Sequence, residues 1–348
     1  MVTEPWQEAL KESLVTVEQL GRRFDFDPGP LTAVAARYPL RITPYYLELI
    51  QEVGDPIWRQ CVPDPRELTD EGLADPLDEE NLSPVPAVIH RYPDRVILLV
   101  SGSCASYCRF CTRKRKVGCA EMSLSFRELR EGIAYIKDHP QIRDVIFSGG
   151  DPLILPDAVL HDLLSRVHAI PHVEIIRIGS RVPVTLPERI TDRLCTMLKE
   201  FHPLYLNTHF NHPRELTQQA AQACARLADA GIVLGNQTVL LQGVNDRPEI
   251  IGELCRGLLA MRVRPYYLHH MDLVRGTAHF RTSIDTGLNI MRALRGPVSG
   301  LAVPHYVIDL PGGRGKVPLL PEYVQRQGDL LLIRTPDGGS LEYPADPG

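Results

Sequence analysis

The sequence predicts a parallel α/β protein, built as a partial barrel of six strand–helix units. Short apolar runs alternate with helical stretches from about residue 95 onward, and this alternation favours a parallel sheet. Polar motifs follow these apolar runs, as in barrel enzymes, whose functional groups lie at the carboxyl ends of the strands. A closed barrel would need eight units, so we predict a partial barrel, with a doubly wound open sheet as the alternative.

The first part of the chain is predicted to be helical and to end in a connector. Apolar residues recur at helical spacing from Trp6 to Leu20, and Thr43 followed by Pro44 is typical of a helix start. Residues 62–88 are rich in proline and acidic residues, which favours an ordered connector over packed secondary structure. We therefore expect three regions: 1–90 as helical region and connector, 91–300 as the partial barrel, and 301–348 as a lysine loop with a carboxy-terminal tail.

The predicted strands are short, near-continuous apolar runs, as expected of parallel strands covered on both faces. They comprise residues 95–100, 144–147, 173–178, 204–207, 232–235 and 263–268. Helical stretches separate them at residues 126–137, 158–168, 190–201, 215–230 and 248–261.

Bulk properties exclude several classes of protein. The chain has 348 residues, a formal net charge of −5 and a pI of about 6.2, whereas a general nucleic-acid binder usually has a basic surplus. The amino terminus lacks a basic start followed by an apolar stretch, so no signal peptide is expected. Apolar runs stay shorter than a membrane span, and eight cysteines without paired spacing suit a reducing cytoplasm.

Three cysteines follow the first predicted strand with the spacing C-x3-C-x2-C, at Cys104, Cys108 and Cys111. An iron–sulfur cubane normally takes one cysteine per iron, so three cysteines leave one iron open to a non-protein ligand. Zinc is the alternative, because it prefers four ligands and Cys119 could supply the fourth.

Two glycine-containing segments are candidate ligand loops. Gly149, Gly150 and Asp151 follow the second strand, and glycine lets a backbone come close to a ligand, although a simple turn would look the same. The segment 309–316 (DLPGGRGK) ends in Lys316 and does not match the spacing of an ATP-binding loop. A lysine displayed in this way suits a Schiff base with pyridoxal phosphate (PLP), with an exposed turn as the alternative.

Two other groups of residues invite different functions. Residues 113–116 (RKRK) are similar to a nucleic-acid patch, but they follow the cysteine loop directly, so we interpret the part after Arg113 as solvated or cofactor-facing. A second metal site is a further alternative. It would draw on His202, His209, His212, His269 and His270. Their spacing is not the H-x3-H of a helical zinc site, except for His209 and His212 taken with Glu215.

Several of these motifs together resemble the lysine 2,3-aminomutase family of radical S-adenosylmethionine (SAM) enzymes. The similar segments are 90–95 (HRYPDR), 104–113 (CASYCRFCTR), 147–152 (FSGGDP), 235–237 (GNQ), 264–267 (RPYY) and 311–316 (PGGRGK). The resemblance runs from about residue 5 to about residue 325, and it implies the partial (β/α)6 barrel of radical SAM enzymes.

The resemblance also implies three cofactors and the residues that hold them. Cys104, Cys108 and Cys111 would bind a [4Fe-4S] cluster, and Lys316 would form the Schiff base with PLP. Arg91 and Arg95 would approach the PLP phosphate. SAM would be lined by Gly149, Gly150, Asp151, His209 and Gln237.

The implied reaction is the interconversion of L-lysine and β-lysine by migration of the amino group between carbons 2 and 3. Arg113 matches the residue that binds the substrate carboxylate, and an arginine can hold a carboxylate through two parallel hydrogen bonds. Asp272 and Asp309 match the two acids that bind the distal ammonium, and paired carboxylates select a cationic side chain. Either acid could instead be an ordinary turn residue. A low-potential flavodoxin or ferredoxin would supply the electron.

Departures from the family pattern leave alternatives open. No cysteine follows Cys255, so the carboxy-terminal zinc site of longer family members is absent and a homo-oligomer is left open. Arg314 and His269 stand where glycine and an aromatic residue are common. The alternatives are another cationic substrate such as arginine, a lysine aminomutase that serves translation-factor modification, and a non-catalytic iron–sulfur or zinc-binding regulator.

Overall fold

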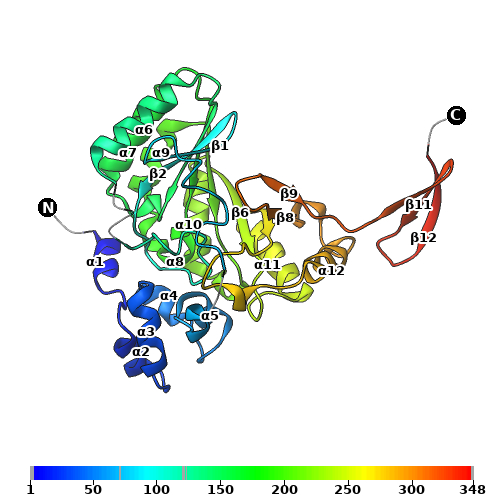
Figure 1. The fold of residues 1–348 in the computed structure, drawn as a ribbon, viewed down its shortest axis with the longest axis horizontal. Coiled ribbons are helices and arrows are strands. Elements are labelled where there is room, and N and C mark those ends of the chain that lie inside the picture. Colours follow the sequence, from blue (N-terminus) through cyan, green and yellow to red (C-terminus); the bar gives the residue numbers. More distant parts are fainter. Residues whose placement is uncertain (1–3, 70–71, 120–121, 123, 346–348) are drawn as a thin grey trace.

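The computed structural model describes residues 4–69, 72–119, 122 and 124–345, and its centre is a nine-stranded sheet (Figure 1). The strand order follows the sequence from β1 to β9, and β2 to β8 pair in parallel while β1 and β9 pair antiparallel at the two edges. The strands are β1 Val88–Tyr92, β2 Arg95–Ser101, β3 Asp144–Gly149, β4 Ile175–Gly179, β5 Leu204–Thr208, β6 Val233–Val239, β7 Arg264–His269, β8 His305–Asp309 and β9 Lys316–Pro318. Within the described residues the edge strands do not pair with each other, so the sheet is an open, partial barrel.

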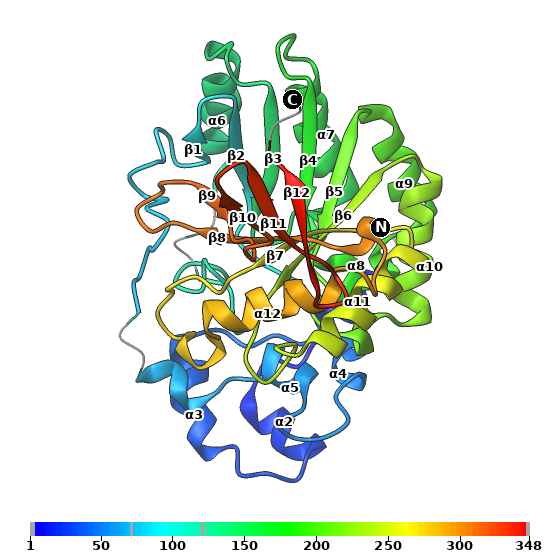
Figure 2. The same cartoon turned by 90° about the vertical axis from the view of Figure 1, so that its right-hand side faces the viewer.

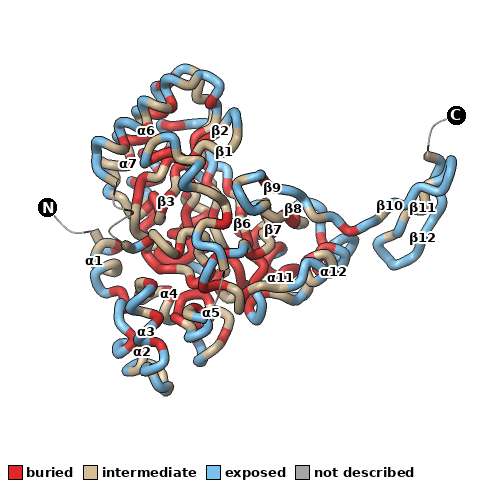
Figure 3. Tube along the Cα trace, in the orientation of Figure 1, coloured by how far each residue is buried: buried red, intermediate tan, exposed pale blue. Residues whose placement is uncertain are grey.

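The six predicted strands are confirmed as β2 to β7, and the five predicted helices lie between them along the chain. These helices are α6 Phe126–Asp138, α7 Asp157–His168, α9 Asp192–Leu198, α10 Gln218–Asp229 and α11 Pro248–Ala260, and they cover the outside of the curved sheet (Figure 2). Leu160 and Leu164 of α7 share one apolar core with Phe147 of β3 and Ile176 of β4. The residues of this core are almost fully buried (Figure 3). Their packing holds the strands, and therefore the strand ends, in place.

The amino-terminal region is helical, but the stretch from Trp6 to Leu20 is not one helix. It divides into α1 Pro5–Lys11 and α2 Val17–Arg23, because Leu14 exchanges two backbone hydrogen bonds with Ile42 and Thr16 caps a new helix through Gln19. The helices α3 Gly29–Arg37, α4 Pro44–Glu48 and α5 Pro56–Cys61 follow. The predicted helix start at Thr43 is confirmed, since its hydroxyl accepts a hydrogen bond from the Tyr46 amide at 3.2 Å.

Three features were not predicted from the sequence. A further unit, formed by helix α12 Ile284–Leu294 and strand β8, extends the sheet beyond β7. The tail forms a separate antiparallel sheet from β10 Val324–Gln327, β11 Leu330–Arg334 and β12 Ser340–Pro344, which extends away from the body (Figure 1). Strand β1 occupies the end of the expected connector. No helix in the described part of the chain combines the length and the apolar character needed to cross a membrane.

Candidate active site

One cavity of about 560 Å³ at the carboxyl ends of the parallel strands brings together every residue that the family resemblance implied for a cofactor or the substrate. The residues that line it include Arg91, Arg95, Cys104, Cys108, Cys111, Arg113, Gly149, Gly150, Asp151, His209, Gln237, Asp272, Asp309 and Lys316. Each of these residues lies in one of the strands β1 to β9, other than β4, or in the loop that follows such a strand. The polar motifs that follow the strands therefore line one cavity.

The cysteine loop follows β2 and places three thiols in the cavity wall. Burial raises the pKa of the Cys104 thiol well above its usual value and that of Cys111 to about 11, so both are protonated without a metal. In the described residues no group of three or more His, Cys, Asp or Glu side chains is arranged to hold a single ion. Zinc would need four ligands on one ion, whereas a cubane binds each thiolate to a different iron.

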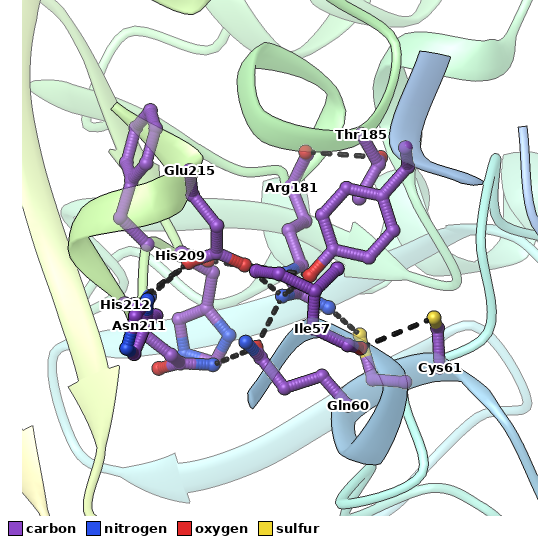
Figure 4. A network of polar contacts seen from close by, with 12 residues as sticks. Ile57, Gln60, Cys61, Arg181, Thr185, His209, Asn211, His212 and Glu215 are labelled. Atoms are coloured by element: carbon purple, nitrogen blue, oxygen red, sulfur yellow. Dashed lines mark hydrogen bonds and ion pairs between the residues drawn. The ribbon is translucent and has the colours of Figure 1, made fainter. Parts of the chain in front are cut away.

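Arg181, which follows β4, places a buried cation beside the cysteine loop (Figure 4). Its Nη1 donates to Cys108 Sγ at 2.9 Å, and its Nη2 donates to Glu215 Oε1 at 2.7 Å and to Gln60 Oε1 at 2.6 Å. Tyr46 accepts a further hydrogen bond at 2.9 Å. The amino-terminal helices and the loop after β5 thus hold the guanidinium in place, a role that the sequence did not reveal.

Gly149 and Gly150 are required by the close packing of the end of β3 against the cysteine loop. A Cβ atom at Gly149, where φ is +119°, would lie 2.3 Å from the Ser101 carbonyl oxygen, and one at Gly150 would lie 2.2 Å from that of Ser103. Asp151 accepts hydrogen bonds from Ser180 Oγ at 2.7 Å and from the Arg181 amide at 2.8 Å. This motif therefore joins β3, β4 and the cysteine loop.

His209 and Gln237 complete the same side of the cavity. His209 lies beside Phe110, with ring centroids 6.2 Å apart, and burial together with the charge of Arg181 lowers its pKa to about 3. The imidazole is therefore neutral at physiological pH. Gln237 lies in β6, at an irregularity in its pairing with β7.

Lys316 points into the cavity and is not a solvated surface lysine. It is the first residue of β9, opposite Asp309 of β8, and its Nζ lies 2.5 Å from Asp309 Oδ2 and 3.3 Å from His269 Nδ1. Its side chain is 23% exposed. Gly312, Gly313 and Gly315 of the preceding loop all have positive φ, which explains why the turn that presents Lys316 is rich in glycine.

The two acids predicted to bind a distal ammonium have opposite electrostatic environments. Burial would raise the pKa of Asp309, but hydrogen bonds from His269 and Lys316, together with their charges, hold it well below its usual value. Arg91 Nη1 also donates to Asp309 Oδ1, at 2.9 Å. For Asp272, burial and then the charge of Asp309 raise the pKa to about 7. One acid is therefore fixed as an anion, and the other changes charge near neutrality.

Arg95 is a candidate for an anion ligand. Its Nε forms a long ion pair with the Asp94 carboxylate at 3.4 Å, and its side chain is 41% exposed. The guanidinium also lies over the Tyr92 ring, 4.4 Å from its centroid. The other donors of this guanidinium could therefore bind a phosphate oxygen in the cavity.

The basic run 113–116 is only partly solvated, because Lys114 is buried while the side chain of Lys116 is 38% exposed. Lys114 is buried and lies 2.7 Å from the Glu67 carboxylate, while Arg115 lies 3.1 Å from that of Asp75. Lys116 contacts Glu80 at 2.8 Å. Acids of the 62–88 connector neutralise the run, which explains the acidic composition of that segment and argues against a nucleic-acid surface.

Arg113, the first residue of this run, is paired with Glu79, a residue that the sequence analysis missed. Its Nε and Nη2 donate to the two carboxylate oxygens at 2.9 and 2.7 Å. Its Nη1 contacts Ser148 Oγ at 3.2 Å and the Gly149 carbonyl oxygen at 3.4 Å. Glu79 also lines the cavity, and the acidic composition of the connector was the only signal for it.

Comparisons with known proteins match nearly the whole chain. Residues 98–254 match the family model of the radical SAM superfamily, and residues 291–345 match that of lysine-2,3-aminomutase. The L-lysine 2,3-aminomutase of Fusobacterium nucleatum is 48% identical over 346 residues, which cover 97% of this chain and 81% of that protein. The L-lysine 2,3-aminomutase of Clostridium subterminale is 46% identical over 346 residues, with coverage of 97% and 83%. The glutamate 2,3-aminomutase of Clostridioides difficile is 45% identical over 318 residues, with coverage of 90% and 75%.

Proposed function

The chain belongs to the lysine 2,3-aminomutase family of radical SAM enzymes, and we propose that it interconverts L-lysine and β-lysine by moving the amino group between carbons 2 and 3. The observation that carries this proposal is the arrangement of Arg113, Asp272 and Asp309 in the same cavity as Lys316. That cavity offers a cation for a carboxylate and a pair of acids for a distal ammonium.

The residues of the cavity fit the three cofactors of the family. Three thiols in the cavity wall beside an arginine suit a [4Fe-4S] cluster at Cys104, Cys108 and Cys111. Lys316 would hold PLP, and Arg95, with Arg91, would face its phosphate. SAM would lie against the cysteine loop, lined by Gly149, Gly150, Asp151, His209 and Gln237. When bound, these groups supply a carbon radical that removes hydrogen from the substrate and a π-system that stabilises the substrate radical.

The chain's own residues would fix the substrate at its two ends. Arg113 would bind the carboxylate, and Asp309 already accepts a lysine ammonium, because Lys316 Nζ lies 2.5 Å from its carboxylate. The distal ammonium of a lysine substrate is the same chemical group. Holding both ends would place carbon 3 at a constant position, and positioning of this kind contributes about 7 kcal/mol or more in favourable cases.

The acid pair also predicts which substrates are rejected. Two carboxylates beside the distal end attract a cation and oppose an anionic side chain, so L-glutamate should react at least about 100-fold more slowly than L-lysine. We expect L-arginine to rank between them, because its cation is larger. The test compares kcat/KM for the three amino acids with the anaerobically reconstituted enzyme. Faster turnover of glutamate or arginine than of lysine would contradict the proposed substrate.

The charge of Asp272 predicts how substrate binding depends on pH. Because its pKa is about 7, the carboxylate is mostly ionised at pH 8 and mostly protonated at pH 6. The KM for L-lysine should therefore rise about tenfold as the pH falls from about 8 to about 6, since the protonated acid no longer attracts the ammonium.

Asp272→Asn should have a high KM at both pH values and lose this dependence, while Asp138→Asn, at an exposed acid, should behave like the wild type. Steady-state kinetics at several pH values test both statements. The same pH dependence in the Asp272→Asn variant would show that another group causes it.

The remaining partners are proposed from the chemistry. A low-potential flavodoxin or ferredoxin in the cytoplasm would supply the electron that the cluster needs.

A further inference from the structure

Glu79 and Arg113 form a buried, bidentate ion pair in the wall of the active-site cavity. The carboxylate accepts hydrogen bonds from Nε at 2.9 Å and from Nη2 at 2.7 Å, and the two side chains are only 14% and 12% exposed. A guanidinium this deeply buried needs a counter-charge, because an uncompensated cation in the interior is strongly unfavourable. Glu79 provides that counter-charge and also limits how the guanidinium can rotate.

The pair leaves one edge of the guanidinium open. An arginine has five N–H donors, and Glu79 takes the edge formed by Nε and Nη2. Nη1 makes only the longer contacts with Ser148 and Gly149, at 3.2 and 3.4 Å. The outer edge, formed by Nη1 and Nη2, can therefore bind a second carboxylate that replaces one of these longer contacts while Glu79 stays in place.

Glu79 is itself held by a connector that is attached on both sides of the cavity. Leu77 O accepts a hydrogen bond from Arg91 Nη2 at 3.3 Å, and Pro76 O accepts one from the Gly312 amide at 2.8 Å. On the other side, Asp75 contacts Arg115, which follows the cysteine loop. These attachments fix the backbone near Glu79 relative to both the lysine loop and the cysteine loop.

The Glu79–Arg113 pair also separates the active-site cavity from a second cavity of about 280 Å³, because both residues line both spaces. The second cavity is lined by Glu80 of the connector together with Lys116 and Met122. Without Glu79, the guanidinium of Arg113 could also turn into the second cavity, so it would no longer have a single orientation.

We propose that Glu79 is a positioning residue for substrate recognition, which holds Arg113 so that its open edge meets the carboxylate of the amino acid substrate. This inference rests on the proposed role of Arg113 in binding that carboxylate. Because Glu79 acts on binding and not on the reacting carbons, its loss should change KM much more than kcat.

The test is the substitution Glu79→Gln, which keeps the shape of the side chain and removes its charge. With the reconstituted holoenzyme, we expect the KM for L-lysine to rise about tenfold or more, as for the loss of a charge-assisted hydrogen bond, while kcat changes less than about threefold. Glu79→Asp keeps the charge but shortens the side chain, so it should also raise the KM if orientation is what matters.

Glu80→Gln is the matched control. It removes the same charge from the neighbouring residue, whose side chain is 57% exposed. It should leave the KM near the wild-type value. Iron and PLP contents and the unfolding temperature are measured for each variant, so that a folding defect is recognised.

Several outcomes would overturn the inference. An unchanged KM in both Glu79 variants would do so, as would an equal rise in Glu80→Gln. A lower KM would show that Glu79 competes with the substrate. These results are distinguishable from failure of the proposed function, in which the wild-type enzyme itself forms no β-lysine.

Discussion

Replacing Cys108 by alanine should remove the iron–sulfur cluster and abolish reductive cleavage of SAM. The cysteine loop offers three thiols, and the loss of one leaves two, too few to anchor a cubane that already has one open iron. The anaerobically reconstituted Cys108→Ala protein should be colourless, with iron content far below about four per chain. Its formation of 5′-deoxyadenosine should fall by on the order of 10³-fold or more, because no other redox centre is proposed.

Cys119→Ala is the control for this result and also a test of the zinc alternative. Cys119 lies eight residues beyond Cys111 and was the candidate fourth ligand of a zinc site. Under the cluster assignment this variant keeps its brown colour and its SAM cleavage. Full iron content in Cys108→Ala, or loss of the metal in Cys119→Ala, would show that the ligand set is wrong.

Replacing Lys316 by alanine should abolish covalent attachment of PLP and reduce turnover by on the order of 10³-fold or more. Lys316 is the lysine whose Nζ lies in the cavity, next to Asp309 and His269. Reduction of the wild-type protein with borohydride should therefore trap PLP on a single peptide that contains Lys316, as measured by mass spectrometry.

The exposed Lys199 provides the matched control for the lysine prediction. Lys199→Ala should retain the trapped adduct and the activity of the wild type. A Lys316→Ala variant that still trapped PLP on another lysine at the wild-type level would refute the role of Lys316.

The elements that could be predicted are those in which the local pattern of apolar residues reflects how the element is buried. Most of the strands from β2 to β7 contain short apolar runs, because alternate residues pack into the core beneath the helices, and these runs stand out between amphipathic helices. Strand β8 was missed because its sequence, HYVID, begins and ends with a polar residue and has an apolar run of only three residues. The break between α1 and α2 was missed because a distant partner, Ile42, causes it.

The candidate site shows the same limit. The family resemblance identified residues that line the cavity, because cysteine spacing and glycine-rich loops are local signals. It did not identify the partners of those residues, which are distant in sequence. Glu79 pairs with Arg113 across 34 residues, and Glu215 pairs with Arg181 across the same number. No local periodicity connects such pairs. Only the three-dimensional arrangement therefore shows that Glu79 already takes one edge of the Arg113 guanidinium.

For two of the expected features, the structure gives a further physical reason. Gly149 and Gly150 were interpreted as ligand-contacting glycines, but their lack of side chains is explained by the carbonyl oxygens of Ser101 and Ser103 that lie against them. The connector was expected to be ordered, and its acids prove to neutralise the basic run that follows the cysteine loop.

The central claim is tested most directly by incubating the anaerobically reconstituted protein with L-lysine, SAM, PLP and a reductant, and separating the products by chromatography. The account predicts β-lysine, with the same mass as lysine, that appears only when SAM, PLP and reductant are all present. Formation of 5′-deoxyadenosine without β-lysine would contradict lysine as the substrate. Absence of both products from a protein with full iron and PLP contents would contradict the proposed chemistry itself.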